Sequence, residues 1–494
     1  MLRLLRRFDV RPLVGAALVS AAIAFVLPQC SSNESQNSGS PDSGTNPLLE
    51  TGLQGEVPRA DQMSGRSKQG YIKNMKVIGH TDVNNRGGNG HLGWIDECAY
   101  FRGGKVGTPE AGLAVVDVKD PTKPTVVNIF APPAGYSDFA VWADQTSRLL
   151  VTNHLSAANS LLRVYTVPAD CTKPVLAGTY NFGNDNGQVI TIHEHKVWHD
   201  KIFVGVLLKF ATPTFDPNTG EAILTGPAPG PSLTVVDASD PTKPTLLTTW
   251  DMSDEPGQLK SGIHNLSISA DGTRAYVAGY QLTPDGHGMS GLVILDTSEV
   301  ANWKPGNPRP TIRRVSPFLA WHFPGASHTA ELATIAGRKY VLAENEGGAG
   351  CPSGFAQIID VNNVLGLFPL SSFRLEISDP RNCTQVLADI QGWAGLLALN
   401  STHYLGVDNP DDAKLAAFTW YGSGLRIVDI SNPETPKEVA YFNAPAVVPT
   451  YLVTGQTGQA PFFPDPAYSF VRYHNGNWWH VTIDGGFWVT QYTP

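Results

Sequence analysis

Charged residues are scarce in this chain. Lys, Arg, Asp and Glu make up 16% of its 494 residues, whereas about 25% is usual in soluble domains. The formal net charge is −9, and no basic face is visible in the sequence. Binding to a phosphate backbone needs such a face, so the composition argues against nucleic acid as a partner.

Familiar catalytic motifs are missing as well. The chain has no G-x-S-x-G turn of the kind that presents a nucleophilic serine. The segment HEHKV at 193–197 does not have the H-E-x-x-H spacing of helical zinc sites. Any catalytic or binding site must therefore be assembled by the fold from distant residues.

Cysteine is rare, and the first of the five stands in a targeting segment. Cys30 follows the apolar run PLVGAALVSAAIAFVLP at 12–28, and several arginines precede that run. Residues 1–30 thus resemble the signal of a bacterial lipoprotein, with Cys30 as the lipidated residue and 31–70 as a flexible polar linker. Pro28 and Gln29 differ from the small residues that usually precede such a cysteine, so plain secretion and an uncleaved anchor are alternatives. Each of these places the protein outside the cytoplasm. A lipoprotein would lie at the cell surface or in the periplasm, and otherwise the protein would be secreted. The only expected membrane contact is through the N-terminal anchor.

One phrase recurs along the rest of the chain. GLAVVDVKDPTKP at 112–124 returns as SLTVVDASDPTKP at 232–244 and as GLRIVDISNPETP at 424–436. Its apolar run fits a strand that is buried on both faces, and the Asp-Pro or Asn-Pro that follows predicts a turn. With some decay the strand occurs seven times, at 113–118, 162–167, 233–238, 292–297, 356–361, 425–430 and 487–492. A mean spacing of about 62 residues indicates one supersecondary unit that is used again and again.

Each unit has the strands of a propeller blade. Two strands with a tight turn precede the phrase, most clearly IHNLSISADGTRAYVAGY at 263–280, and a more polar strand follows it. The last unit lacks its fourth strand, and NMKVIGHTDV at 74–83 has the character of one. We therefore predict an all-β fold in which 71–494 forms a single seven-bladed β-propeller. The N-terminal strand would join the C-terminal blade and close the ring.

The recurring phrase resembles the LVIVD repeat, which occurs in exported bacterial propeller proteins. GLAVVDVKDP, SLTVVDASDP, GLVILDTSE and GLRIVDISNP carry this resemblance, which extends over nearly all of 71–494. It implies a cell-surface or secreted propeller, and it implies no activity common to the family.

Blade geometry also predicts how the remaining cysteines pair. An even number in an exported chain is typical of disulfides. Cys351 and Cys383 are expected near the channel mouth, and Cys98 and Cys171 near turns at the opposite face. We predict the pairs Cys351–Cys383 and Cys98–Cys171, with free buried thiols as the alternative.

Histidines recur near the start of the first strand of the blades. These starts meet at one end of an antiparallel ring, so the residues there should crowd the mouth of the central channel. Alignment of the blades places five residues at this position, namely His91, Asp138, His193, His264 and His328. Imidazoles beside carboxylates suit Zn, Cu or Fe, so the four histidines are candidate ligands of a transition metal. Selenium-binding-type oxidases are similar in being propellers with inward histidines, although the chain lacks their cysteine signatures. Histidines that hydrogen-bond one blade to the next are the alternative.

Other residues are expected to line the same pocket, namely Asp138, His154, His195, Glu331, Glu344, Glu346 and Trp393. Trp393 takes the place of the histidine in blade six. Long insertions at about 209–231, 281–290 and 409–423 should project from the same face, and such loops on a rigid scaffold usually carry recognition.

Two functions of different class follow from these patterns. The favoured one is a surface binding or scaffold protein that recognises an unknown protein, glycan or small-molecule ligand through its mouth loops. The alternative is a metal-dependent extracytoplasmic enzyme with the histidine ring as its site. There, Asp138 or Glu346 would act as a base or as a partner of a metal ligand.

Overall fold

The computed structural model describes most of the chain beyond residue 47. The described ranges are 48–104, 111–132, 138–154, 160–182, 188–211, 214–215, 222–223, 232–252, 261–282, 288–321, 326–347, 351–389, 400–447, 462 and 465–494. Ser43–Pro494 forms one compact unit. Cys30, Trp393 and most of the predicted 209–231 loop lie outside the described residues. Among the described helices, none has the length and apolar character needed to cross a membrane.

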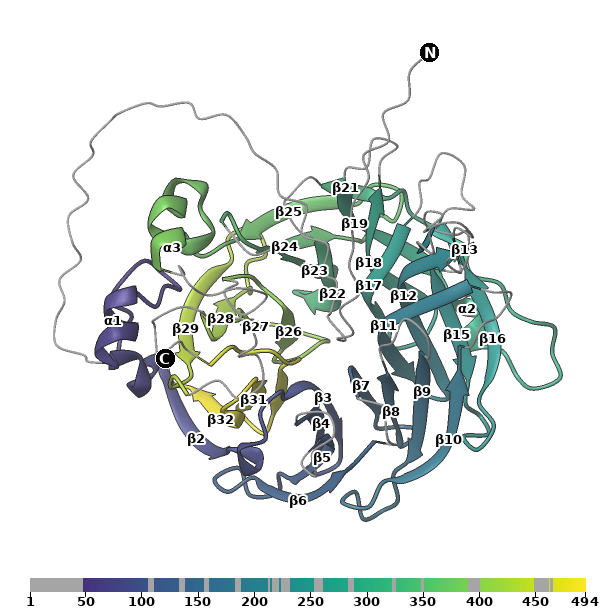
Figure 1. Ribbon diagram of the computed structural model, residues 1–494. Helices are drawn as coiled ribbons and strands as arrows, with labels where there is room; N and C mark the ends of the chain where they lie inside the picture. The colour runs from purple at the N-terminus through teal and green to yellow at the C-terminus, as the bar shows by residue number, and fades with distance from the viewer. Residues whose placement is uncertain are drawn as a thin grey trace. The chain divides into compact units, whose positions relative to one another are not determined.

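Seven antiparallel sheets form the blades of the propeller, and Figure 1 shows them set around a common centre. Blade one contains β3 (Gly90–Ile95), β4 (Cys98–Gly103), β5 (Gly112–Asp117) and β6 (Thr125–Phe130). Blade two contains β7 (Val141–Asp144), β8 (Leu149–His154), β9 (Leu161–Thr166) and β10 (Val175–Asn181). Blade three contains β11 (Gln188–Trp198), β12 (Lys201–Ala211), β15 (Leu233–Asp237) and β16 (Thr245–Trp250). A short hairpin of β13 (Thr214–Phe215) and β14 (Ala222–Ile223) lies between β12 and β15 in the chain.

The remaining blades follow the same order. Blade four contains β17 (Ser261–Ile268), β18 (Arg274–Leu282) and β19 (Gly288–Asp296), with β20 (Arg313–Arg314) and β21 (Leu319–Trp321) both paired to β19. Blade five contains β22 (Ala326–Ile335), β23 (Arg338–Glu346), β24 (Phe355–Asp360) and β25 (Phe368–Phe373). Blade six contains β26 (Tyr404–Val407), β27 (Leu415–Thr419), β28 (Leu425–Asp429) and β29 (Lys437–Asn443). The short helix α2 (Ser298–Ala301) follows β19.

Blade seven combines one strand from the N-terminal part of the chain with three from its C-terminal end. Its order is β2 (Met75–Thr81), β32 (Gly486–Tyr492), β31 (Asn477–Thr482) and β30 (Arg472–His474). β2 runs antiparallel to β32, with Met75 opposite Tyr492. The innermost strands touch in succession from β3 through β7, β11, β17, β22 and β26 to β30, and β31 contacts β3. The inner ring is therefore continuous.

The recurring phrase forms the third strand of the blades, as its apolar run predicts. In β15 every residue is buried. The turn that follows is held by Asp240, whose Oδ1 accepts hydrogen bonds from the Thr242 backbone N–H at 3.0 Å and from its hydroxyl at 2.6 Å. A short side-chain acceptor two residues before the donor is what Asp supplies in such turns, so the same phrase yields the same corner in several blades.

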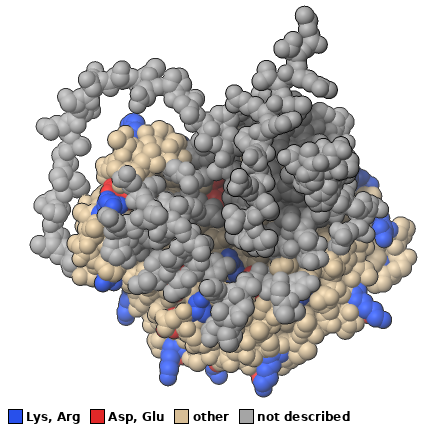
Figure 2. All heavy atoms as spheres, viewed as in Figure 1, with Lys and Arg blue, Asp and Glu red and all other residues tan. Residues whose placement is uncertain are grey.

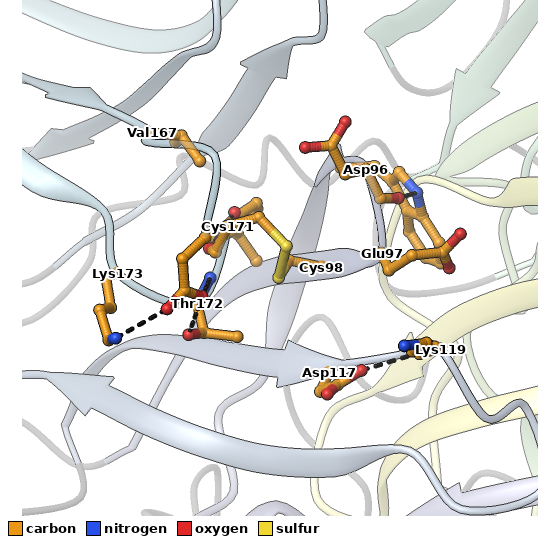
Figure 3. The surroundings of a disulfide bond; sticks show 12 residues. Asp96, Glu97, Cys98, Asp117, Lys119, Val167, Cys171, Thr172 and Lys173 are labelled. Atoms are coloured by element: carbon orange, nitrogen blue, oxygen red, sulfur yellow. Dashed lines mark hydrogen bonds and ion pairs between the residues drawn. A yellow bond between two sulfur atoms is a disulfide. The ribbon is translucent and has the colours of Figure 1, made fainter.

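Both predicted disulfides are present. Cys98, at the start of β4, is joined to Cys171 in the turn before β10, as Figure 3 shows. Cys351 is joined to Cys383, the first residue of the helix α3 (Cys383–Asp389). Disulfides persist in oxidising compartments, so the two bonds indicate an environment outside the cytoplasm.

The expectation of a flexible linker as far as residue 70 is wrong for its last part. Residues 48–73 contain α1 (Arg59–Ser64), a 3₁₀ turn (Arg66–Gln69) and β1 (Tyr71–Lys73), which pairs with β29 as a fifth strand of blade six. Although these residues are mostly polar, a few of their side chains are buried against the propeller. Arg426, inside β28, pairs with Glu50, and both side chains are buried.

Glu56 gives this N-terminal segment a pH-dependent contribution to stability. The side chain is 3% exposed, and its Oε2 accepts hydrogen bonds from the Leu53 N–H at 2.9 Å and from Gln385 Nε2 at 2.8 Å. Burial, together with the nearby Asp389 carboxyl, raises the pKa of Glu56 to about 7. A carboxyl with a raised pKa binds its proton more tightly in the folded state. Its contribution to stability is therefore present near pH 4 and is lost as the pH rises through about 7.

We expect Glu56→Gln to remove this pH dependence. Between pH 4.5 and pH 8 the wild-type free energy of unfolding should fall by about 1–3 kcal/mol more than that of the variant. Urea unfolding at several pH values measures the difference. Glu376→Gln is the control. Glu376 accepts a hydrogen bond from the Gln54 N–H of the same N-terminal segment, but at an exposed position. This variant should therefore keep the wild-type pH profile. Parallel profiles for wild type and Glu56→Gln would contradict the prediction.

Blade six differs from the sequence alignment. The expected mouth insertion at 409–423 contains β27, and the segment between β26 and β27 is the first turn of the blade. That turn lies at the end of the ring opposite the strand starts. The expectation failed because the acidic segment at 408–414 was assigned to the wrong pair of strands.

Candidate metal centre

The first strand of four blades has a β-bulge at a histidine. The register between the first and second strands shifts at His91 in blade one, His193 in blade three, His264 in blade four and His328 in blade five. A bulge bends the strand and redirects a side chain, and bulges are common beside functional sites. These four histidines therefore share a local backbone feature as well as a position at one end of the ring.

Four imidazoles lie next to one another in the order of the blades. The ring centroids of His193 and His264 are 4.1 Å apart, and those of His264 and His328 are 3.9 Å apart. His403, directly before β26, continues the row at 4.4 Å from His328. Histidines from blades three to six thus meet at the propeller axis.

Two carboxylates face these rings. Glu194 Oε1 lies 3.7 Å from His193 Nδ1, 3.9 Å from His264 Nδ1 and 4.0 Å from His328 Nε2. Glu346 Oε2 lies 3.8 Å from His264 Nε2 and 3.9 Å from His328 Nε2, and its Oε1 lies 4.0 Å from His403 Nε2. Two sets of potential metal ligands result, His193–Glu194–His264 and His264–His328–Glu346, with ligand atoms within 4.8 Å of one another in each set.

Two tyrosines hold the carboxylates in place. The Tyr404 hydroxyl donates to Glu194 Oε1, and the Tyr421 hydroxyl donates to Glu346 Oε1. The Tyr404 oxygen also lies 3.2 Å from His91 Nε2. Among the predicted ligands, His91 therefore joins the cluster through a tyrosine, and it adjoins neither carboxylate in the described contacts.

Burial governs the charges of the cluster. It lowers the pKa of His193 to about 3 and places those of His264, His328 and His403 well below their ordinary value. Burial likewise raises the pKa of Glu194 to about 8 and that of Glu346 to about 7. The histidines are therefore neutral at physiological pH, which is the form with a free lone pair for a metal.

Several ring nitrogens lack a hydrogen bond. Within the described part of the chain, no partner is found for the buried His193 Nδ1, His264 Nδ1 and His328 Nε2. Buried polar atoms nearly always have a partner, and an unmet one costs about 1–3 kcal/mol. All three atoms lie within 4.0 Å of Glu194 Oε1, and His328 Nε2 lies 3.9 Å from Glu346 as well. Together they point to a bound cation.

Asp138 lies outside this cluster. Its carboxylate forms an ion pair with Arg163, and both side chains are 1% exposed. Asp138 is thus committed to a structural pair, and the prediction of a catalytic base at this position does not fit the structure.

The other predicted pocket residues occupy different layers. His195 Nε2 lies 3.0 Å from the Val151 carbonyl oxygen, which ties blade three to blade two in the manner of a structural histidine. Glu331 lies 3.9 Å from Lys196 Nζ, and that ammonium stands over the Trp142 ring. Glu344 is buried, and burial raises its pKa well above the ordinary value. His154 is buried at the end of β8.

Sequence reasoning missed His403, Tyr404 and Tyr421. Trp393, which was expected at the mouth of blade six, lies ten residues before His403. The signal was present, because THYLG at 402–406 resembles GHLGW at 90–94 and stands directly before an apolar strand. Glu194 stands between His193 and His195 in the sequence but is not among the predicted site residues. In an unbroken strand neighbouring residues point to opposite faces. The bulge at 193–194 removes that alternation.

Comparison with known proteins supports the fold. The sequence profile of the LVIVD repeat matches residues 106–131, 229–251 and 420–444, which cover the third and fourth strands of blades one, three and six. The chain is an LVIVD-repeat β-propeller. No curated protein matches its sequence.

Solved structures similar to this LVIVD-repeat propeller are distant. The β-propeller domain of Cps50 (Swd1) from Myceliophteria thermophila aligns with a TM-score of 0.45 at 10% identity, covering 85% of this chain and 100% of that one. Sqt1 from Saccharomyces cerevisiae aligns at 0.40 and 10% identity, covering 83% and 97%. A hypothetical selenium-binding protein from Sulfolobus tokodaii aligns at 0.36 and 11% identity, covering 73% and 82%. The fold assignment therefore rests on the strand pairings of the chain itself and not on these alignments.

Proposed function

We propose that this propeller is an exported metal-dependent enzyme with a transition-metal site at its axis. The observation that carries the proposal is the convergence of buried, unpartnered imidazole nitrogens from blades three, four and five on the carboxylates of Glu194 and Glu346. Imidazole with carboxylate is a donor set that suits Zn, Cu or Fe.

The exposure of the ligands indicates where a substrate would enter. The Glu346 side chain is 15% exposed and that of His193 is 13% exposed, whereas those of Glu194 and His328 are 1% and 0% exposed. A metal ion here would act as a Lewis acid and lower the pKa of a bound water. Glu346, held by Tyr421, is the more exposed of the two carboxylate ligands, and a substrate would enter beside it.

Elemental analysis of the purified full chain tests the proposal. We expect at least one Zn, Cu or Fe ion per chain, and its loss in the variant His264→Ala/His328→Ala. His474→Ala is the matched control, because this ring is 25% exposed and pairs with Glu97, which is not part of the cluster. Titration of metal-stripped wild-type protein with Zn²⁺ gives a second readout that needs no variant. Wild-type protein that neither carries nor binds metal would overturn the proposal, as would a double variant that is folded by circular dichroism and keeps its metal.

The destination of the chain forms part of the same proposal. The lipoprotein-like pattern at 1–30 and the two disulfides both support export. Cys30 would be the lipidated residue that anchors the protein at the cell surface or in the periplasm. In Figure 2 basic side chains stand singly around the visible face. A partner protein, glycan or small ligand at the mouth remains a prediction, since much of the expected mouth loops lies outside the described residues.

A further inference from the structure

The ligands at the axis fall into two groups that share a single residue. One group is His193, Glu194 and His264, and the other is His264, His328 and Glu346. Metal bonds to nitrogen and oxygen are about 2.0–2.2 Å long, so two ligands of one ion lie at most about 4.4 Å apart. Five ligand residues in two groups are therefore more than one tetrahedral ion would use.

His264 presents its two ring nitrogens to different carboxylates. Nδ1 lies 3.9 Å from Glu194 Oε1, and Nε2 lies 3.8 Å from Glu346 Oε2. The two carboxylates come from β11 and β23, in blades three and five, on either side of blade four, which carries His264. An imidazole ring between two carboxyl groups is arranged to bind a cation at each nitrogen, and a cation beside a carboxyl favours its ionised form.

The surroundings of the two carboxylates repeat one pattern. Each carboxylate accepts a hydrogen bond from one tyrosine hydroxyl through its Oε1, from Tyr404 at Glu194 and from Tyr421 at Glu346. Each also has a further histidine beside it, His193 at Glu194 and His328 at Glu346, and His328 Nε2 lies 4.0 Å from Glu194 Oε1 as well. Two similar half-sites thus flank His264, and His403 lies 4.0 Å from Glu346 as an additional donor.

We propose that the axis holds two transition-metal ions bridged by His264. One ion binds His193 Nδ1, Glu194 and His264 Nδ1, and the other binds His264 Nε2, His328 Nε2 and Glu346. Binding of the second ion releases the remaining ring proton of His264 to solvent, so that the bridge is an imidazolate whose charge the two cations balance. This inference rests on the proposed metal site but adds its nuclearity and its bridging ligand.

Titration of metal-stripped full-length protein with Cu²⁺ tests the bridge. We expect two copper ions per chain by elemental analysis after dialysis. The integrated electron paramagnetic resonance signal at low temperature should fall well below the copper content, because two Cu²⁺ ions across an imidazolate couple antiferromagnetically. His193→Ala and His328→Ala should each retain one ion with a full, uncoupled signal, and His474→Ala should behave as wild type.

The outcomes separate this inference from the proposed function. Two coupled ions in the wild type support the bridge without reliance on any variant. One ion per chain overturns the two-ion site and leaves the metal site standing. Two ions with a full signal overturn the bridge through His264. Wild-type protein that binds no copper, zinc or iron overturns both proposals together.

Discussion

Arg426→Met should lower the free energy of unfolding by about 3–5 kcal/mol, since removal of one partner from a buried ion pair leaves an uncompensated charge. The Arg426 side chain is fully buried. Its guanidinium pairs with Glu50 and lies 3.3 Å from Glu438, and it donates to the Ser423 carbonyl oxygen at 2.6 and 2.8 Å. Burial alone would lower the pKa of Arg426, and the two carboxylates raise it above its ordinary value.

The expected loss is large because the network joins two parts of the chain. Glu50 belongs to the N-terminal segment 48–73, and Glu438 lies in β29 of blade six. Without Arg426, both carboxylates are buried with no cation, and the segment should detach from the blade. Chemical denaturation measures the free energy, and limited proteolysis within 48–73 reports the detachment.

Two further variants test the role of the Arg426 network. Arg381→Ala removes an ion pair with Asp379 in which the arginine side chain is 88% exposed, and should cost less than about 1 kcal/mol. Arg426→Met/Glu50→Gln/Glu438→Gln removes the charges together and should recover part of the loss, because neutral replacement of a whole buried network is tolerated better than removal of one member. A loss below about 1 kcal/mol for Arg426→Met, with segment 48–73 still resistant to protease, would contradict the role assigned to this arginine.

The blades could be predicted from the sequence because their chemistry is local and repeated. An apolar run such as LTVVDA (233–238), followed by Asp-Pro, defines a buried strand and its corner without reference to the rest of the chain. Repetition of the phrase then gives the number of blades, and antiparallel order gives the face on which each turn lies. The pairing of Cys98 with Cys171 followed from that geometry, and the structure contains it.

The site could be predicted only in part, because its details depend on irregularities. His193, His264 and His328 share a position in the repeat and were found in that way. His403 was missed because the spacing of blade six departs from the others, and Glu194 was missed because a bulge reverses the side-chain alternation. Asp138 shares the histidine position but has a buried arginine, Arg163, as its partner. Arg163 lies in β9, and the sequence around Asp138 does not predict that the two residues pair.

Composition also could not predict that the segment at 48–73 is folded. Its Gly, Ser and Gln content is typical of linkers, yet a few side chains that reach blade six suffice to order it. Glu50 illustrates this, because its side chain meets Arg426 and its backbone N–H donates to the Tyr441 hydroxyl at 2.9 Å. Long-range partners of this kind have no local signature.

Removal of the Cys98–Cys171 disulfide should lower the free energy of unfolding by about 4 kcal/mol, the chain-entropy value for a long closed loop. The bond closes 73 residues and connects blade one with blade two, whereas Cys351–Cys383 closes 32 residues. Cys98→Ala/Cys171→Ala should therefore be destabilised slightly more than Cys351→Ala/Cys383→Ala. Cys98 is fully buried, and Tyr100 donates to the Cys171 carbonyl oxygen at 2.6 Å, so the two blades remain in contact after the bond is lost.

Denaturation with and without reductant checks this order. Wild-type protein should lose stability on reduction by at least the amount that separates it from Cys98→Ala/Cys171→Ala. The variant itself should respond to reductant only through its remaining disulfide. If that double variant unfolds at the same denaturant concentration as the oxidised wild type, the bond does not restrain the unfolded chain. Contacts between blades one and two would then account for their stability without it.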